Sequence, residues 1–279
     1  MTGAKFKERA DVVIRLILVA VSVIIILIPI YYTVMNSFKD AKEIADNISA
    51  LPKHPNLDNY KDAWRRLNFP VAFKNTFIVT LFSTIGVVIF ASMNGYWIAR
   101  HNNPFTKVWT VLFLSGMSVP FQCIMITFAK MIGLLNLGNK YFGVVVSFWA
   151  LSIPMAMFLT SGAVKSIPIE IEEAAIIDGC NAFTTFWLVV FPLIKGTIFT
   201  IASLNVLTYW NNYLMTQFIL TKKNMRTIQI AMQSLFNEAL FSWDTAVAAV
   251  SLSMLPLFIF FIIAQKQVLG GATAGAVKG

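Results

Sequence analysis

Six long stretches without a charged residue constrain this sequence more than any other feature. An α-helix needs about 20 residues without an unpaired charge to cross the hydrocarbon layer of a membrane. Six stretches meet that length, and they cover residues 16–35, 75–99, 108–129, 141–164, 196–221 and 245–265. The pattern predicts an all-α integral membrane protein with six transmembrane helices, organised as a single transmembrane domain over residues 1–279.

Composition and charge placement agree with a membrane protein. The chain is 57% hydrophobic and 13% charged, and its mean hydropathy of +0.71 is well above that of a soluble domain of this length. The first stretch is too long for a cleaved signal, and no small-residue cleavage site follows it directly, so an uncleaved helix is expected. Six spans place both termini on one side. The basic residues Lys5, Lys7, Arg9 and Arg15 favour the cytoplasmic side, although the basic residues of the later loops are not decisive.

Several kinds of chemistry are missing from the sequence. All 13 acidic residues lie outside the six stretches, which argues against a proton-coupled carrier, because such carriers commonly relay protons through intramembrane carboxylates. His54 and His101 lie in loops, and Cys123 and Cys180 have no paired spacing. We therefore expect no catalytic residues, no metal site and no cofactor bound by this chain. The chain has 22 Lys and Arg residues against 13 Asp and Glu residues. This excess of positive charge suits an anionic lipid surface rather than nucleic acid.

The segment 165–195, between the fourth and fifth stretches, carries the strongest signal. Residues 166–179 read SIPIEIEEAAIIDG and predict a short helix with Ser166 or Ile167 at its start, Pro168 in its first turn and Gly179 at its end. Its apolar residues fall on two sides, so contacts on both sides are expected. From these residues alone, packing on the membrane surface and docking of a partner remain equally open. The run 179–194 is too short to span and is interpreted as an interfacial helix.

Part of this segment resembles a known motif. Glu173-Ala-Ala175, three residues, Gly179, nine residues and Val189-Val-Phe-Pro192 resemble the coupling loop of permease subunits of ABC importers. Val189 and Phe191 stand where the family usually has Ile and Leu, which are mild changes. The resemblance implies a cytoplasmic coupling helix between spans four and five that docks in a groove on an ATPase subunit. The implied coupling residues are Glu173, Ala174, Ala175, Asp178, Gly179 and Pro192.

Further likeness points to one branch of that family. Ser166-Ile-Pro168, Trp210-Asn-Asn-Tyr213 and the tail 271–279 resemble the smaller permease of maltose-type sugar importers. The resemblance implies a chain that forms half of the translocation path for a sugar or oligosaccharide in a bacterial or archaeal cytoplasmic membrane. Its implied partners are a second homologous permease, two ATPase subunits that use ATP and Mg, and an extracytoplasmic solute-binding protein. The outer loop 222–244 is the expected contact for the binding protein, and the tail is a candidate contact for the ATPase pair.

Polar and aromatic residues inside the stretches are candidates for the solute path. Aromatic rings stack on sugar faces and amides hydrogen-bond hydroxyls, but the same residues also hold helices together or mark the membrane interface. The candidates are Asn94, Trp97, Gln122, Asn205, Trp210, Asn211 and Tyr213.

Two alternative hypotheses about the function of the chain predict different features. A self-sufficient secondary carrier or channel would transport alone and needs a coupling residue that the sequence does not show. A membrane-bound enzyme or scaffold needs a reactive cluster or a large soluble domain, and neither is visible. Four prolines inside the stretches, at positions 29, 120, 154 and 256, are compatible with either kinks or hinges.

Overall fold

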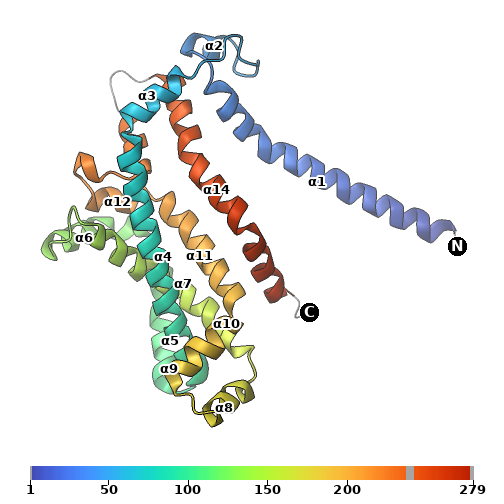
Figure 1. The fold of residues 1–279 in the computed structure, drawn as a ribbon, viewed down its shortest axis with the longest axis vertical. Helices are drawn as coiled ribbons and strands as arrows, with labels where there is room; N and C mark the ends of the chain where they lie inside the picture. The colour runs from blue at the N-terminus through green and yellow to red at the C-terminus, as the bar shows by residue number, and fades with distance from the viewer. Residues whose placement is uncertain (1, 237–241, 277–279) are drawn as a thin grey trace. The chain divides into compact units, whose positions relative to one another are not determined.

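The computed structural model confirms an all-helical chain. It describes the backbone of residues 2–236 and 242–276 and the side chains of residues 11–236 and 242–265, and it contains no strand within that part. The chain divides into two compact units, Met1–Phe69 with Met232–Pro256 and Pro70–Ala231 with Leu257–Gly279. In chain order (Figure 1), the helices are α1 Thr2–Asn36, α2 Ala41–Asp46, α3 Asp58–Arg66, α4 Phe69–Arg100, α5 Pro104–Met117, α6 Phe121–Leu134, α7 Tyr141–Lys165, α8 Ile169–Ile177, α9 Ala182–Thr185, the π-helix η1 Phe186–Val190, α10 Phe191–Leu193, α11 Lys195–Trp210, α12 Leu214–Ile219, the 3₁₀-helix η2 Lys223–Met225, α13 Ile228–Phe236 and α14 Trp243–Ala276.

Four helices are long and apolar enough to cross a membrane on their own. They contain the segments Asp11–Asn36, Phe69–Arg100, Tyr141–Lys165 and Trp243–Gln265, and they correspond to the first, second, fourth and sixth expected spans. None of the 18-residue apolar window in α1 is buried in the structure. Such a surface is the kind that membrane lipid or another apolar surface covers.

The segment between α1 and α4 forms an ordered cap in the first unit. Lys39 is fully buried, and its Nζ donates to Asn36 Oδ1 at 2.9 Å and to the Asn47 carbonyl at 3.0 Å. The Asn59 side chain donates to the carbonyls of Ser37 and Lys39. Hydrogen bonds from and to buried polar groups therefore hold this cap together.

In the second unit, α4 and α7 run parallel to each other. Near the start of both helices, Tyr141 Oη donates to Asn75 Oδ1 at 2.6 Å. At their other end, Arg100 Nη2 donates to the Ile167 carbonyl at 3.1 Å. Because both helices run in the same direction, the chain between them must return along their whole length.

Two glycines of α4 let its backbone approach α7 closely. A Cβ added at Gly95 would lie 2.7 Å from Thr160 Cβ and 2.8 Å from the Met157 carbonyl oxygen. A Cβ added at Gly86 would lie 2.1 Å from the Trp149 ring. Small residues at a helix crossing allow this packing, so α4 and α7 form the tightly packed centre of the unit.

The expectation of one helix over residues 108–129 is wrong. The chain returns instead through α5 and α6, which are bent by 100° relative to each other. Pro120 stands at the break with φ −59° and ψ 137°. It has no N–H to donate to the preceding turn, and it disfavours helical backbone at Val119. Pro29, Pro154 and Pro256 lie inside continuous helices, so proline alone does not decide the break.

The expectation of one helix over residues 196–221 is also wrong. Helix α11 ends at Trp210, and α12 begins at Leu214. At the break, Asn212 Oδ1 accepts from the Thr216 N–H at 3.2 Å, which is the local hydrogen bond by which Asn competes with helix continuation. The segment Ala182–Leu193 precedes α11 at an angle of 78°. If each bent pair is one span, the structure has six candidate spans.

The loop after α12 is tied to the start of α4. Asn75 Nδ2 donates to the carbonyls of Asn224 at 3.1 Å and Arg226 at 2.9 Å. Thr76 Oγ1 accepts from the Ile228 N–H at 2.9 Å. The expected binding-protein loop 222–244 therefore begins with an ordered segment, whereas its residues 237–241 lie outside the described part of the chain.

Candidate functional site

Helices α8, α9 and α10 lie together at the end of the second unit where α4 and α7 end (Figure 1). Helix α8 begins at Ile169, with Pro168 before it, slightly later than the sequence analysis expected. Ser166 and Ile167 instead close the last turn of α7, because their N–H groups donate to the carbonyls of Ala163 and Val164. Acidic residues in the first turn of α8 suit the positive end of its helix dipole.

Gly179 ends α8 for a clear geometric reason. Its φ is +91°, a left-handed conformation that glycine adopts without steric cost. The Gly179 N–H donates to the Ile176 carbonyl, and the Cys180 N–H donates to the Ala175 carbonyl, both at 3.0 Å. These two hydrogen bonds form the Schellman motif that closes helix C-termini. The glycine of the coupling pattern is therefore required by the turn it makes.

The second half of the loop is packed onto the unit by apolar side chains. Asn181 caps α9 by accepting from the Thr184 N–H at 2.9 Å. The chain then passes through η1 and α10, which contains Pro192. Residues Phe186, Val190 and Ile194 of this half form a hydrophobic cluster with Val164 of α7 and Ile198 of α11.

Most of the expected coupling residues are exposed. Glu173, Ala174, Asp178, Gly179 and Pro192 face solvent, and Ala175 is buried. Ile177 is 86% exposed, which leaves an apolar side chain beside the acidic ones. The outer side of α8 is therefore a mixed apolar and acidic surface.

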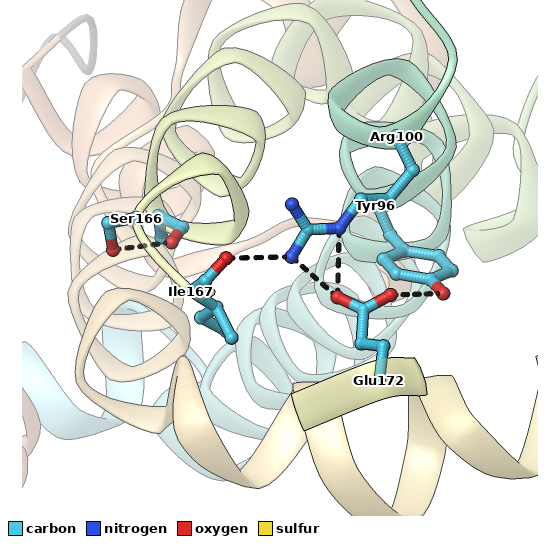
Figure 2. Close-up of polar contacts among 6 residues, drawn as sticks. Tyr96, Arg100, Ser166, Ile167 and Glu172 are labelled. Carbon is cyan, nitrogen blue, oxygen red and sulfur yellow. Dashed lines mark hydrogen bonds and ion pairs between the residues drawn. The ribbon is translucent and has the colours of Figure 1, made fainter. Parts of the chain in front are cut away.

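The buried side of α8 carries an ionic network that the sequence analysis did not find (Figure 2). Glu172 Oε1 accepts from Arg100 Nε at 2.8 Å and Nη2 at 2.5 Å, and its Oε2 accepts from Tyr96 Oη at 2.9 Å. The Arg100 and Glu172 side chains are 15% and 4% exposed. Removal of one partner of such a buried pair costs about 3–5 kcal/mol, because the remaining charge stays buried without its counter-ion. The available signals were an arginine directly after an apolar stretch and a second glutamate beside Glu173.

The candidate solute-path residues do not form one cluster. Asn94 accepts from Trp109 Nε1 at 3.2 Å, and Trp97 stacks on His101. Gln122 is exposed in the first turn of α6, after the Pro120 break.

The other solute-path candidates lie on or just after α11. Asn205 lines a cavity of about 190 Å³ between α7 and α11, and its amide donates to the Ile201 carbonyl at 2.8 Å. Trp210 is buried with its ring centroid 5.8 Å from that of Phe73. Asn211 and Tyr213 flank the break after α11, and the Asn211 amide donates to the Leu207 carbonyl at 3.0 Å. The amides of Asn205 and Asn211 therefore hydrogen-bond to carbonyls of their own helix, and the Asn94 amide joins α4 to α5.

The structure also bears on metal binding. Among the residues that it describes, no group of three or more His, Cys, Asp or Glu side chains is placed to hold a metal ion.

Comparisons with known proteins identify the family of this chain. The model of the family described as "Binding-protein-dependent transport system inner membrane component" matches residues 91–269. The chain is 34% identical over 250 residues to the probable starch degradation products transport system permease protein AmyC of Thermoanaerobacterium thermosulfurigenes, covering 90% of this chain and 91% of that protein.

Two further similarities extend over almost the whole chain. The multiple sugar-binding transport system permease protein MsmG of Streptococcus mutans is 32% identical, covering 98% of this chain and all of that protein. A crystal structure of a bacterial ABC transporter involved in the import of the acidic polysaccharide alginate contains a chain with a TM-score of 0.80 and 23% identity, covering 93% of this chain and 97% of that one. The protein is therefore a multi-pass membrane permease that belongs to the family of binding-protein-dependent transport system inner membrane components.

Proposed function

We propose that this chain is one of two homologous permease subunits in a sugar or oligosaccharide importer. The second permease completes the translocation path, two ATPase subunits bind on the cytoplasmic side, and a solute-binding protein delivers solute from outside. Both termini and α8 lie on the cytoplasmic side of a bacterial or archaeal cytoplasmic membrane. The observation that carries the proposal is the exposed Glu173–Gly179 surface of α8 in a chain of this family.

The class of solute is inferred from the relatives. The names of three similar permeases refer to starch degradation products, to multiple sugars and to melibiose, raffinose and stachyose. These solutes share many hydroxyl groups and apolar ring faces, which amides and aromatic rings can bind. The candidate path residues on α4, α6 and α11 are of these types.

The energy for transport comes from the partner in this proposal. The ATPase subunits bind ATP and Mg, and their closure displaces α8. The displacement shifts the permease between inward-facing and outward-facing states, because the closed ATPase pair binds one state better than the other. A self-sufficient carrier would instead need a coupling group of its own within the membrane.

A matched pair of substitutions tests the docking surface. Ala174 in α8 and Ala45 in α2 are both exposed alanines on short helices. Ala174→Trp places a large ring on the proposed docking surface, so the ATPase should copurify at least roughly tenfold less with tagged chain from gently solubilised membranes. Ala45→Trp makes the same chemical change in the cap, and the ATPase should copurify normally.

Two outcomes would contradict the proposal. Equal recovery of the ATPase with both variants would place docking elsewhere. A tagged chain that purifies alone and transports sugar into liposomes without ATP would show a self-sufficient carrier.

A further inference from the structure

The two halves of the loop between α7 and α11 are attached to the unit in different ways. The second half, α9 to α10, is held by the apolar cluster that contains Phe186 and Val190. In contrast, α8 buries only Glu172 and Ala175, and the left-handed turn at Gly179 separates it from the apolar cluster. The Glu172 side chain is therefore the main polar attachment of α8 to the rest of the unit.

The partners of Glu172 join three elements at one point (Figure 2). Arg100 and Tyr96 lie on the last turns of α4 and occupy both carboxylate oxygens. The same guanidinium donates to the Ile167 carbonyl, just after α7. Rotation of α8, or sliding along α4, would break charge-assisted hydrogen bonds to a carboxylate that is almost fully buried, and such bonds are stronger than neutral ones.

The helices that hold this network are fixed to each other. Gly95 lies five residues before Arg100, and its backbone packs against Thr160 and Met157 of α7. The rings of Tyr96 and Phe186 also pack together, with centroids 5.1 Å apart. The Arg100 guanidinium is therefore anchored on a close-packed helix pair, and close-packed interiors transmit displacement.

We infer that Arg100, Tyr96 and Glu172 are positioning residues that make α8 move as one body with α4 and α7. A displacement of α8 is then passed into the helices rather than lost in the loop. This inference rests on the proposed function, in which the ATPase displaces α8. Glu172 and Glu173 are both glutamates but have different roles. Glu172 faces α4 and positions α8, whereas Glu173 faces the partner.

Distances between spin labels on α4 and α8 test the inference in the assembled importer. Labels are attached to Met93→Cys on α4 and Ile169→Cys on α8, both exposed positions outside the proposed docking surface Glu173–Gly179, after Cys123 and Cys180 are replaced by serine. With Glu172 intact, pulsed electron paramagnetic resonance should give one narrow distance distribution at the same position with and without ATP. With Glu172→Gln, the distribution should broaden and shift when ATP is added.

Two further variants make the result interpretable. Glu170→Gln makes the same change at an exposed residue of α8, and its distances should match those of the parent. Glu172→Gln leaves the Arg100 charge buried without its counter-ion, and this could by itself disturb the fold. The double variant Arg100→Gln with Glu172→Gln removes both charges and keeps side chains that can form hydrogen bonds. It should still copurify with the ATPase and still show the ATP-dependent shift.

The outcomes separate this inference from the proposed function. If the double variant binds the ATPase and keeps the narrow, ATP-independent distribution, the ion pair does not fix α8 and the inference is wrong. If no ATPase copurifies with the parent chain, the proposed docking itself fails.

Discussion

Single residues in this protein have sharply different tolerances, and two glycines show why. Gly179 has a φ of +91°, whereas Gly138 has no left-handed φ, and a Cβ added at either meets no atom within 4 Å. Space is therefore not the constraint at Gly179. The constraint is the backbone conformation, because a left-handed residue with a Cβ costs about 1–2 kcal/mol.

This contrast predicts the effect of alanine at each glycine. Gly179→Ala should weaken the two hydrogen bonds that close α8, so amide exchange over residues 176–180 should become roughly tenfold faster. Hydrogen exchange followed by mass spectrometry measures this change. Gly138→Ala should leave the exchange of the same peptide unaltered, and an equal effect of both variants would refute the conformational explanation.

At the level of helices, the packing of α4 on α7 has a different origin. Gly95 is required because Thr160 and the Met157 carbonyl occupy the space where a Cβ would lie. Gly162, on α7 itself, has nothing within 4 Å. A glycine in a helix otherwise destabilises it by about 0.5–1 kcal/mol relative to alanine. The close contact between α4 and α7 therefore explains why glycine is needed at position 95.

Alanine should consequently have opposite effects at these two positions. Gly95→Ala should lower the thermal stability of the solubilised complex by roughly 1–3 kcal/mol, because α4 and α7 must separate. Gly162→Ala should leave the stability unchanged or raise it by up to about 1 kcal/mol. Fluorescence-detected size-exclusion chromatography after heating measures the direction of both changes as shifts of the apparent melting temperature. A stabilising Gly95→Ala would show that α4 and α7 are not in close contact.

The helices also show what sequence reasoning can and cannot predict. The four continuous apolar helices were predicted because the length of an apolar stretch is local information. The break at Pro120 was not predicted, because Pro154 lies inside a continuous helix and neighbouring packing decides between the two results. The short helix α8 was predicted because Pro168 and Gly179 mark a helix start and end locally. The Arg100–Glu172 pair was not predicted, because it joins residues 72 positions apart that meet only once α4 and α7 have packed in parallel.

For the whole molecule, the parallel course of α4 and α7 determines how many times the chain crosses the membrane. If α5 and α6 together form one crossing, the cap before α4 and the end of α7 lie on opposite sides. If that bent pair does not cross, both lie on the same side. This second arrangement would require α7 to run antiparallel to α4. The hydrogen bonds at both ends of the parallel pair therefore favour the first arrangement, although α5 and α6 are bent by 100° relative to each other.

Cysteine labelling distinguishes four crossings from six. In a background without Cys123 and Cys180, Lys53→Cys and Lys165→Cys place single thiols at exposed positions of the cap and of the α7 end. A membrane-impermeant maleimide should label Lys53→Cys in right-side-out vesicles and Lys165→Cys only in inside-out vesicles. Labelling of both thiols from one side would contradict the six-span topology.

Helix α4 contacts both of the loops that we propose as partner contacts. Near its start, Asn75 and Thr76 bind the segment 224–228, and at its end Arg100 holds α8. Its 32 residues span about 48 Å. If binding at one loop changes the affinity at the other through this helix, thermodynamic linkage requires the reverse effect to have equal size. A binding protein that strengthens ATPase docking must then itself bind more tightly, by the same factor, once the ATPase is docked.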